Sequence, residues 1–283
     1  MKFGLMFANT GPFIQPEGLT LLAQTAEEVG VESLWTVEHV VVPIGYESAY
    51  PYSPDGKMPG SEEAPIPDPL VWLSYAAAVT KKIKLATGII ILPQRHPLYL
   101  AKEAATLDML SGGRFILGIG VGWLEEEFKA LKVPFKQRGA ITDEAIGALR
   151  DLWSKGTSEH KGEHYAWPQV ESNPKPLNGK VPIVIGGHSK ASARRAARFG
   201  DGFFPARPDK LEECLAELKA ECERIGRDPG EIEITTGGIP TADEIKRLED
   251  LGVSRFTVGP PGFTPDALRE GLEKLGNELI SKF

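Results

Sequence analysis

Glu38 and His39 are adjacent residues that could move a proton. They come directly after Ser33-Leu34-Trp35-Thr36-Val37, a short apolar run typical of a buried β-strand. An imidazole exchanges a proton near neutral pH, so His39 suits a donor or acceptor in catalysis, with a structural histidine as the alternative. Glu38 is either a second acid/base group or the partner of a basic side chain in an ion pair.

A glycine-rich turn, Gly186-Gly187-His188-Ser189, follows the apolar run 182–185 and precedes a predicted helix. Backbone N–H groups in such a turn point outwards, and the helix dipole favours an anion there. The turn therefore predicts a phosphate site; the alternative is a tight turn in which Ser189 only caps the helix. Arg194 and Arg195, about one helical turn further on, either support the phosphate or face solvent.

A second glycine-rich stretch, Gly118-Ile119-Gly120-Val121-Gly122, lies where another apolar run ends. It does not match a dinucleotide-binding fingerprint, because the third glycine comes too soon and no acidic residue ends a following strand at the required distance. Glycines at a strand end let a flat ring or a ribityl chain lie against bare backbone. Further candidates at the ends of predicted strands are Asn9, Thr87, Gly88, Trp123 and Arg207.

Composition narrows the class of protein. The 283 residues carry 32 Lys and Arg against 39 Asp and Glu, a formal charge of −7, so we expect no nucleic-acid partner. We expect no membrane association, because no apolar run is long enough to span a bilayer and no signal peptide is evident. Cys214 and Cys222 are expected to be reduced structural thiols, which together with the missing signal peptide indicates a cytoplasmic location.

Several catalytic and metal-binding motifs are missing from the sequence. There is no HExxH, GxSxG or P-loop pattern, and no histidine–carboxylate cluster at ligand spacing, so we expect no metal. His160 and His164 are four residues apart, but they lie in a glycine-rich excursion and are expected at the surface.

Eight short apolar runs alternate with helical patterns along the chain. They are nearly continuous, as is typical of parallel strands covered on both faces. The predicted strands span residues 2–7, 33–37, 83–91, 114–120, 182–185, 202–204, 232–235 and 255–258. Eight such units favour one closed (β/α)₈ TIM barrel over residues 1–283, with a doubly wound sheet bearing a helical appendage as the alternative. The site of such a barrel lies at the carboxyl ends of the strands, where the candidate residues fall.

Two segments interrupt this alternation. Residues 40–67 are rich in Pro, Gly, Tyr and Ser without a clear period, and a loop of this length in a compact domain is usually functional or mobile. Residues 156–179 carry several Gly and Pro residues and are predicted to form an excursion with a small hairpin around Tyr165-Ala166-Trp167.

The sequence resembles the luciferase-like flavin monooxygenase superfamily, and more narrowly its oxidoreductases that use the deazaflavin coenzyme F420. The similarity runs over most of the chain. The motifs that carry it are 34–39 (LWTVEH), 83–88 (IKLATG), 101–114 (AKEAATLDMLSGGR), 117–123 (LGIGVGW), 126–128 (EEF), 138–139 (RG), 185–189 (IGGHS) and 200–202 (GDG).

The resemblance implies a (β/α)₈ barrel, often a homodimer, with a flavin or deazaflavin across its carboxyl face. It places His39 near the reactive ring carbon and a non-prolyl cis peptide at Gly88-Ile89 behind the ring. Glu38 joins His39 as a catalytic candidate. The candidate cofactor-binding residues are Asn9, Thr87, Gly88, Ile89, Gly120, Val121, Gly122, Trp123, Gly186, Gly187, His188 and Ser189.

Cofactor and chemistry are not fixed by these motifs. The better-known deazaflavin enzymes have a tryptophan four residues after the histidine, where this chain has Pro43. We favour an F420-dependent enzyme that transfers hydride to or from a small organic substrate lodged under loop 40–67. The alternatives are an FMN-dependent monooxygenase and a non-catalytic flavin-binding protein, the latter disfavoured by His39 and the polar face around it.

Overall fold

Eight parallel strands form a closed ring in the computed structural model, which describes residues 1–154 and 156–283. Strand β3 pairs with both β2 and β5, and β1 pairs with β11, so the sheet closes on itself. The strands of the ring are β1 (Lys2–Met6), β2 (Ser33–Thr36), β3 (Lys84–Thr87), β5 (Phe115–Gly120), β8 (Ile183–Gly186), β9 (Gly202–Phe204), β10 (Glu233–Gly237) and β11 (Val253–Val258). The predicted (β/α)₈ barrel is confirmed, and the doubly wound alternative is wrong.

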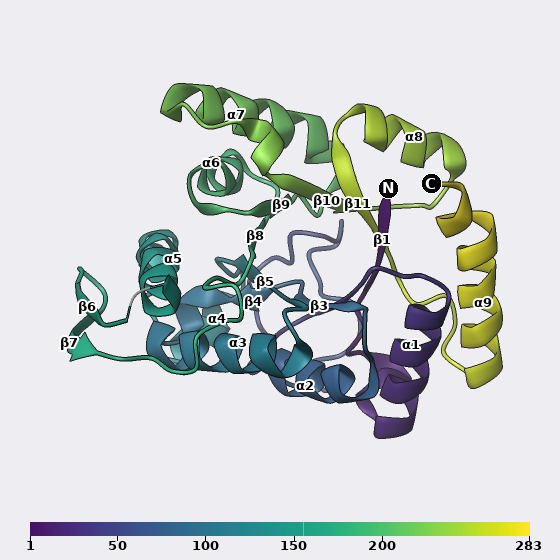
Figure 1. Cartoon of the computed structure of the whole chain (residues 1–283), viewed down its shortest axis with the longest axis horizontal. Coiled ribbons are helices and arrows are strands. Elements are labelled where there is room, and N and C mark those ends of the chain that lie inside the picture. The colour runs from purple at the N-terminus through teal and green to yellow at the C-terminus, as the bar shows by residue number, and fades with distance from the viewer. Residues whose placement is uncertain (155) are drawn as a thin grey trace.

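Helices surround this ring on its outside (Figure 1). They are α1 (Pro16–Glu28), α2 (Pro69–Val79), α3 (Pro97–Ser111), α5 (Arg138–Ser154), α6 (Lys190–Phe199), α7 (Leu211–Ile225), α8 (Ala242–Asp250) and α9 (Pro265–Glu278). The short helix α4 (Glu125–Ala130) contacts residues beyond the end of β2. The predicted hairpin is present as β6 (Ser158–Lys161) and β7 (Ala166–Val170), which project beyond α5. Residues 37–68 contain no helix or strand.

One predicted strand, 83–91, is divided in the structure. It forms β3 and the two-residue strand β4 (Ile90–Ile91), separated by a cis peptide between Gly88 and Ile89. β4 keeps a parallel pairing with β5, with Ile90 opposite Ile119. The chain therefore bulges at the carboxyl end of β3, next to the candidate site.

Two apolar layers stabilise the barrel. The larger lies between the ring and the helices, and the smaller fills the ring with Trp35, Ala86, Ile116, Val184 and Phe204. The rings of Trp35 and Phe204 meet edge to face with centroids 5.4 Å apart, which is a favourable aromatic geometry. Inward-facing residues thus form a packed interior and leave the carboxyl end of the strands for function.

The amino-terminal end of the barrel is filled by an ionic group. Arg255 is 1% exposed, and its guanidinium donates two hydrogen bonds, of 2.8 and 2.9 Å, to the carboxylate of Glu32. A second carboxylate, Glu233, lies 2.8 Å from Nη1 of the same side chain. Burial of this charge is tolerated because both carboxylates compensate it.

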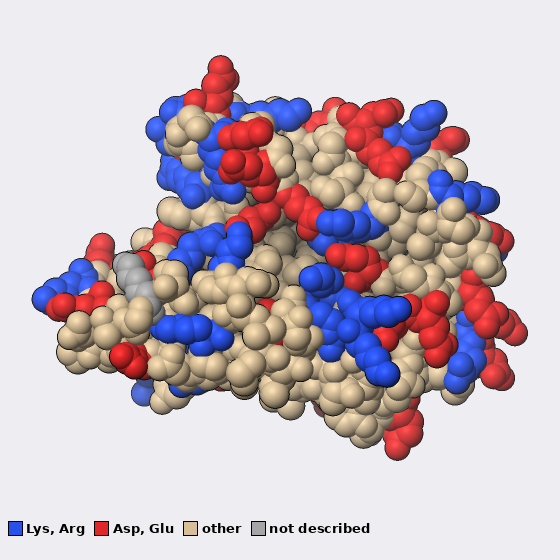
Figure 2. Space-filling model, in the orientation of Figure 1, with Lys and Arg blue, Asp and Glu red and all other residues tan. Residues whose placement is uncertain are grey.

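Basic and acidic side chains are mixed on the face of the molecule shown in Figure 2, and neither charge forms an extended patch there.

Gly118 tests how tightly the ring is closed. A Cβ at this position would lie 1.8 Å from the carbonyl oxygen of Thr87, so Gly118→Ala must displace backbone. We expect a loss of about 3 kcal/mol or more in the free energy of unfolding, because such overpacking cannot relax through a side chain. Thermal or denaturant unfolding followed by circular dichroism measures the change.

Gly147 provides the matched control. It is exposed in the middle of α5, and a Cβ there would have no neighbour within 4 Å. Gly147→Ala should stabilise the protein by up to about 1 kcal/mol, because alanine loses less backbone entropy in a helix. Equal stabilities of the two variants would contradict the close approach of β3 and β5.

Candidate active site

His39 lies at the mouth of the barrel, shortly beyond the end of β2. Its side chain is 9% exposed, and Nδ1 is 3.1 Å from Oε2 of Glu127 on α4. The imidazole meets the indole of Trp123 edge to face, with ring centroids 5.7 Å apart. The structure therefore brings together two residues that the sequence placed at separate strand ends, and it adds a carboxylate partner.

Glu127 is a residue that our sequence reasoning did not assign to the site. Its side chain is fully buried, and Oε1 accepts hydrogen bonds from the backbone N–H groups of Val40 (2.7 Å) and Val41 (3.2 Å). The sequence gives a weak signal for this role, since acidic residues at the start of a helix are common for electrostatic reasons alone. The contact with His39 joins residues 88 positions apart.

Glu38 points away from His39 into a different set of contacts. One carboxylate oxygen accepts a hydrogen bond of 3.0 Å from Nε of Arg95, and the other accepts one of 2.7 Å from the backbone N–H of Ile91. Burial raises the pKa of the Glu38 carboxyl, although the charge of Arg95 acts in the opposite direction. This geometry is that of the ion-pair alternative, and it fastens the bulge between β3 and β4 to the end of β2.

The side chain of Ile89 lies over inward-facing glycines. The Gly88-Ile89 peptide is cis, as the resemblance implied. A Cβ on Gly120 would lie 2.7 Å from Cδ1 of Ile89, and a Cβ on Gly186 would lie 2.7 Å from Cγ2. These two glycines make room for Ile89, which is half-buried at the barrel mouth. A flat ligand at this end would meet an apolar side chain as well as bare backbone.

The chain turns sharply after β5, close to Ile89 and the glycines beneath it. Gly122 has φ +81°, and a Cβ there would lie 2.7 Å from Cε2 of Phe128, so this turn needs glycine. Val121 and Trp123 on either side are both half-buried. Trp123 contacts His39 and Gly120 lies against Ile89, so the structure brings the predicted Gly120–Trp123 segment to the same place.

The predicted phosphate turn follows β8. Gly187 has φ +130°, and Ser189 caps α6, accepting a hydrogen bond from the backbone N–H of Ser192 at 3.2 Å. Nδ1 of His188 is buried without a hydrogen-bond partner. Burial lowers the pKa of His188, and the nearby charge of Arg207 lowers it further. Buried polar atoms usually have a hydrogen-bond partner. The free Nδ1 of His188, in a turn that precedes a helix, is therefore available to bind a ligand.

Basic charge near this turn comes from a residue that our phosphate prediction did not use. Arg194 pairs with Glu217, and Arg195 pairs with Asp143, so both neighbours on α6 are already bound. Arg207, after β9, lies close to His188, pairs with Asp209 at 2.6 Å, and donates a 3.4 Å hydrogen bond to the carbonyl of Pro51 in loop 40–67.

Asn9 and Thr87 are fully buried behind the site. The amide of Asn9 donates to the carbonyls of Val37 (2.9 Å) and Pro67 (3.2 Å) and accepts from the backbone N–H of Val37 (2.8 Å). The hydroxyl of Thr87 donates to the carbonyl of Gly118 at 2.7 Å. These contacts join strand ends and the end of loop 40–67, so any effect of the two residues on a ligand passes through the backbone that they hold.

Loop 40–67 forms a roof of aromatic side chains over the strand ends. Tyr46 and Tyr50 contact Trp123 with ring centroids 5.6 and 5.2 Å away, and Tyr52 contacts His188 at 5.0 Å. The loop thus spans from the Trp123 segment to the predicted phosphate turn.

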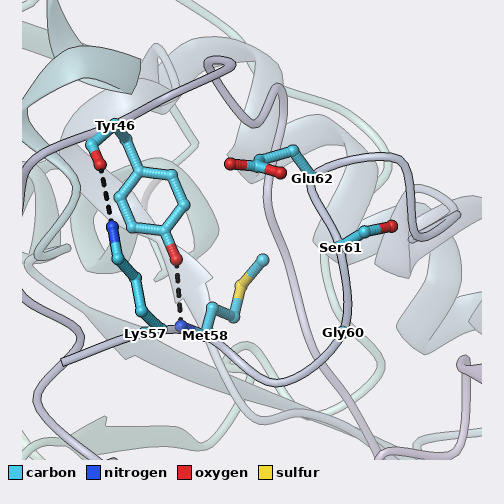
Figure 3. A pocket seen from close by; sticks show the side chains of 6 residues that line it. All are labelled: Tyr46, Lys57, Met58, Gly60, Ser61 and Glu62. Carbon is cyan, nitrogen blue, oxygen red and sulfur yellow. Dashed lines mark hydrogen bonds between the residues drawn. The ribbon is translucent and has the colours of Figure 1, made fainter. Parts of the chain in front are cut away.

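The same loop encloses a small cavity of its own, about 170 Å³ in volume (Figure 3). Lys57 donates to the carbonyl of Tyr46 at 3.3 Å, and the phenol of Tyr46 accepts from the backbone N–H of Met58 at 2.9 Å. The carboxylate of Glu62 extends towards the ring of Tyr46. The cavity is lined by Tyr46, Lys57, Met58, Gly60, Ser61 and Glu62.

His160 and His164 are not the plain surface residues that we expected. Nε2 of His160 lies 2.9 Å from the carboxylate of Glu144, and its ring stacks on Trp167 at 4.8 Å. Nε2 of His164 is buried without a partner. The reason is that Glu144 on α5 binds His160 and the backbone N–H groups of residues 163–165, which no local pattern indicates.

The described residues contain neither a metal-binding cluster nor a membrane-spanning helix. In residues 1–154 and 156–283, no three His, Cys, Asp or Glu side chains are grouped so that they could hold a metal ion. Each helix in the same ranges is too short or too polar to cross a membrane.

Comparison with known proteins identifies the family. The family model for luciferase-like monooxygenases matches residues 1–250. An uncharacterised protein of Mycobacterium tuberculosis is 35% identical over 272 residues, which cover 92% of this chain and 94% of the relative. The F420-dependent glucose-6-phosphate dehydrogenase of Amycolatopsis mediterranei is 31% identical over 193 residues, which cover 67% of this chain and 53% of that enzyme.

The fold is shared with solved structures. The crystal structure of monooxygenase RslO1 from Streptomyces bottropensis has a TM-score of 0.77 at 22% identity and covers 100% of this chain and 99% of that chain. The family match over residues 1–250 and the shared fold both agree with the closed barrel. The chain belongs to the family of luciferase-like monooxygenases.

Proposed function

We propose that the protein is an oxidoreductase that uses coenzyme F420 to transfer hydride to or from a small organic substrate. The observation that carries the proposal is the grouping of His39, Trp123 and Ile89 at the barrel mouth under loop 40–67. F420, when bound, supplies the hydride chemistry, and the protein supplies orientation and electrostatics. The 31% identical F420-dependent relative supports this cofactor.

The residues of the site have distinct roles in this proposal. Ile89, Gly120 and Gly122 support one face of a flat ring, and the Gly186–Ser189 turn binds its phosphate. His39 exchanges a proton with the substrate or the ring through Nε2, because Nδ1 faces Glu127. The aromatic roof excludes water from the reacting atoms.

Glu38 is assigned a positioning role. Its two oxygens are bound to Arg95 and to the backbone of Ile91, so it holds the bulge that carries Ile89. This role replaces the second acid/base group that we considered from the sequence, and it leaves His39 as the proton carrier.

An FMN-dependent monooxygenase is the second candidate function, because the matching family model describes monooxygenases. A non-catalytic flavin-binding protein is the third. A homodimer in the cytoplasm and the absence of nucleic-acid partners stay predictions. Exposed apolar side chains on α2 and α3, among them Val71, Tyr99 and Leu110, are compatible with a dimer.

Cofactor binding is the first test. Purified protein is titrated with F420 and with FMN, and binding is read from cofactor fluorescence. We expect F420 to bind more tightly, and His188→Ala to weaken its binding by roughly 5- to 30-fold, because the turn loses a buried polar partner worth about 1–2 kcal/mol. Failure to bind either cofactor would refute the proposal.

His164→Ala is the control for this titration. His164 also has a buried ring nitrogen without a partner, but it lies in the β6–β7 excursion. It should leave the affinity unchanged, and equal losses in both variants would indicate a general effect on folding.

His39→Ala tests the proton-transfer role. Turnover with the bound cofactor should fall by about 10²- to 10⁴-fold, the range for loss of a general acid or base, while cofactor affinity changes little. His160→Ala, which removes a histidine paired with Glu144 outside the site, should keep full turnover. Unchanged turnover in His39→Ala would assign the chemistry to another group.

A comparison of Glu38→Gln with Arg95→Met separates the two roles of Glu38. If Glu38 serves as an ion-pair partner, each variant should lose about 3–5 kcal/mol of stability, and the double variant should lose much less than the sum. Turnover would then fall in both single variants, and at least as much in Arg95→Met, because Arg95 also pairs with Asp68. A much larger loss of turnover in Glu38→Gln alone would restore the acid/base role.

A further inference from the structure

We infer that Glu127 is a positioning residue that fixes the tautomer of His39 and ties it to the start of loop 40–67. The inference rests on the proposed function for its catalytic consequence. The hydrogen bonds on which the tautomer of His39 depends are present in the protein without cofactor. The tautomer can therefore be tested independently of the proposed function.

The backbone decides which atoms accept. The N–H groups of Val40 and Val41 can only donate, and both meet Oε1 of Glu127, at 2.7 and 3.2 Å. The other oxygen, Oε2, faces Nδ1 of His39 at 3.1 Å. A carboxylate that already receives two backbone donors is an acceptor on its remaining side, so Nδ1 of His39 carries the hydrogen.

With the hydrogen on Nδ1, Nε2 of His39 is free to exchange a proton. A neutral imidazole has one N–H, so placing it on Nδ1 leaves Nε2 with a lone pair that can accept a proton. The edge-to-face contact with Trp123 at 5.7 Å restrains the ring from a second side. Glu127 thus sets both the orientation and the direction of proton exchange of His39, as a carboxylate does for a catalytic histidine in other folds.

A second carboxylate on α4 also binds the backbone of loop 40–67. Glu126, the preceding residue on α4, accepts hydrogen bonds from the backbone N–H groups of Glu47 (2.9 Å) and Ser48 (3.1 Å). Adjacent carboxylates on one short helix therefore hold residues 40–41 and 47–48 of the loop. Only Glu127 also contacts the imidazole, so the two carboxylates form a matched pair for an experiment.

The first measurement uses the wild-type protein without cofactor. Side-chain ¹⁵N chemical shifts and couplings of His39, assigned by their loss in His39→Ala, report which ring nitrogen is protonated above the titration range of the ring. We expect Nδ1–H with Nε2 unprotonated. The Nε2–H tautomer would overturn the inference, and this result does not depend on any variant folding.

The second measurement compares Glu127→Gln with Glu126→Gln. If the amide oxygen introduced by Glu127→Gln keeps the bonds from Val40 and Val41, the new NH₂ group faces Nδ1 of His39, which must then accept. The tautomer of His39 should switch to Nε2–H in Glu127→Gln and stay Nδ1–H in Glu126→Gln. An unchanged tautomer in Glu127→Gln would overturn the inference.

Activity with the loaded cofactor gives a third readout. Turnover should fall about 10- to 100-fold in Glu127→Gln, in the range found for partners that orient a functional histidine, and Glu127→Gln combined with His39→Ala should be no worse than His39→Ala. Equal losses in Glu126→Gln and Glu127→Gln would mean that both act only by fastening the loop, which contradicts the inference. Failure to bind F420 or FMN would reject the proposed function and leave the tautomer result standing.

Discussion

Two buried carboxylates, Glu38 and Glu127, constrain the mouth of this barrel. A carboxylate removed from water is costly unless donors surround it, so each one fixes the groups that compensate it. Glu38 fixes Arg95 and the backbone of Ile91, and Glu127 fixes His39 and the first residues of loop 40–67. The imidazole, the bulge after β3 and the loop therefore share one frame of hydrogen bonds.

The bulge and the glycines depend on each other. Glu38 holds the chain that places Ile89 over Gly120 and Gly186, and these positions admit that side chain because they have no Cβ. At the opposite end of the barrel, Glu32 and Glu233 compensate the buried charge of Arg255. The barrel thus has a buried ionic group at the amino-terminal ends of its strands and an apolar surface, formed by Ile89, at the carboxyl ends. An apolar surface of this kind suits a ligand with a flat ring.

The sequence predicts the elements of this fold well, because strand and helix patterns are local. It also places His39, Trp123 and the Gly186–Ser189 turn at strand ends, which the barrel then brings to one face. The partners of these residues are not local. Glu127 meets His39 across 88 residues, and Arg194 and Arg195 turn to Glu217 and Asp143, so their orientation depends on tertiary packing. The cis peptide at Gly88-Ile89 followed from resemblance alone, since no local pattern indicates it.

The attachment of loop 40–67 has an evolutionary consequence. Its beginning is fastened by Glu126 and Glu127, and its end by Asn9 and by Asp68, which caps α2 and pairs with Arg95. The stretch between residue 48 and residue 67 leaves these fastenings untouched. Lengthening or exchanging that stretch costs little closure entropy, since each doubling of loop length adds only about 0.6 kcal/mol. Homologues can therefore differ in the sequence and length of this stretch while the two attachments, and with them the position of the His39 imidazole, are kept.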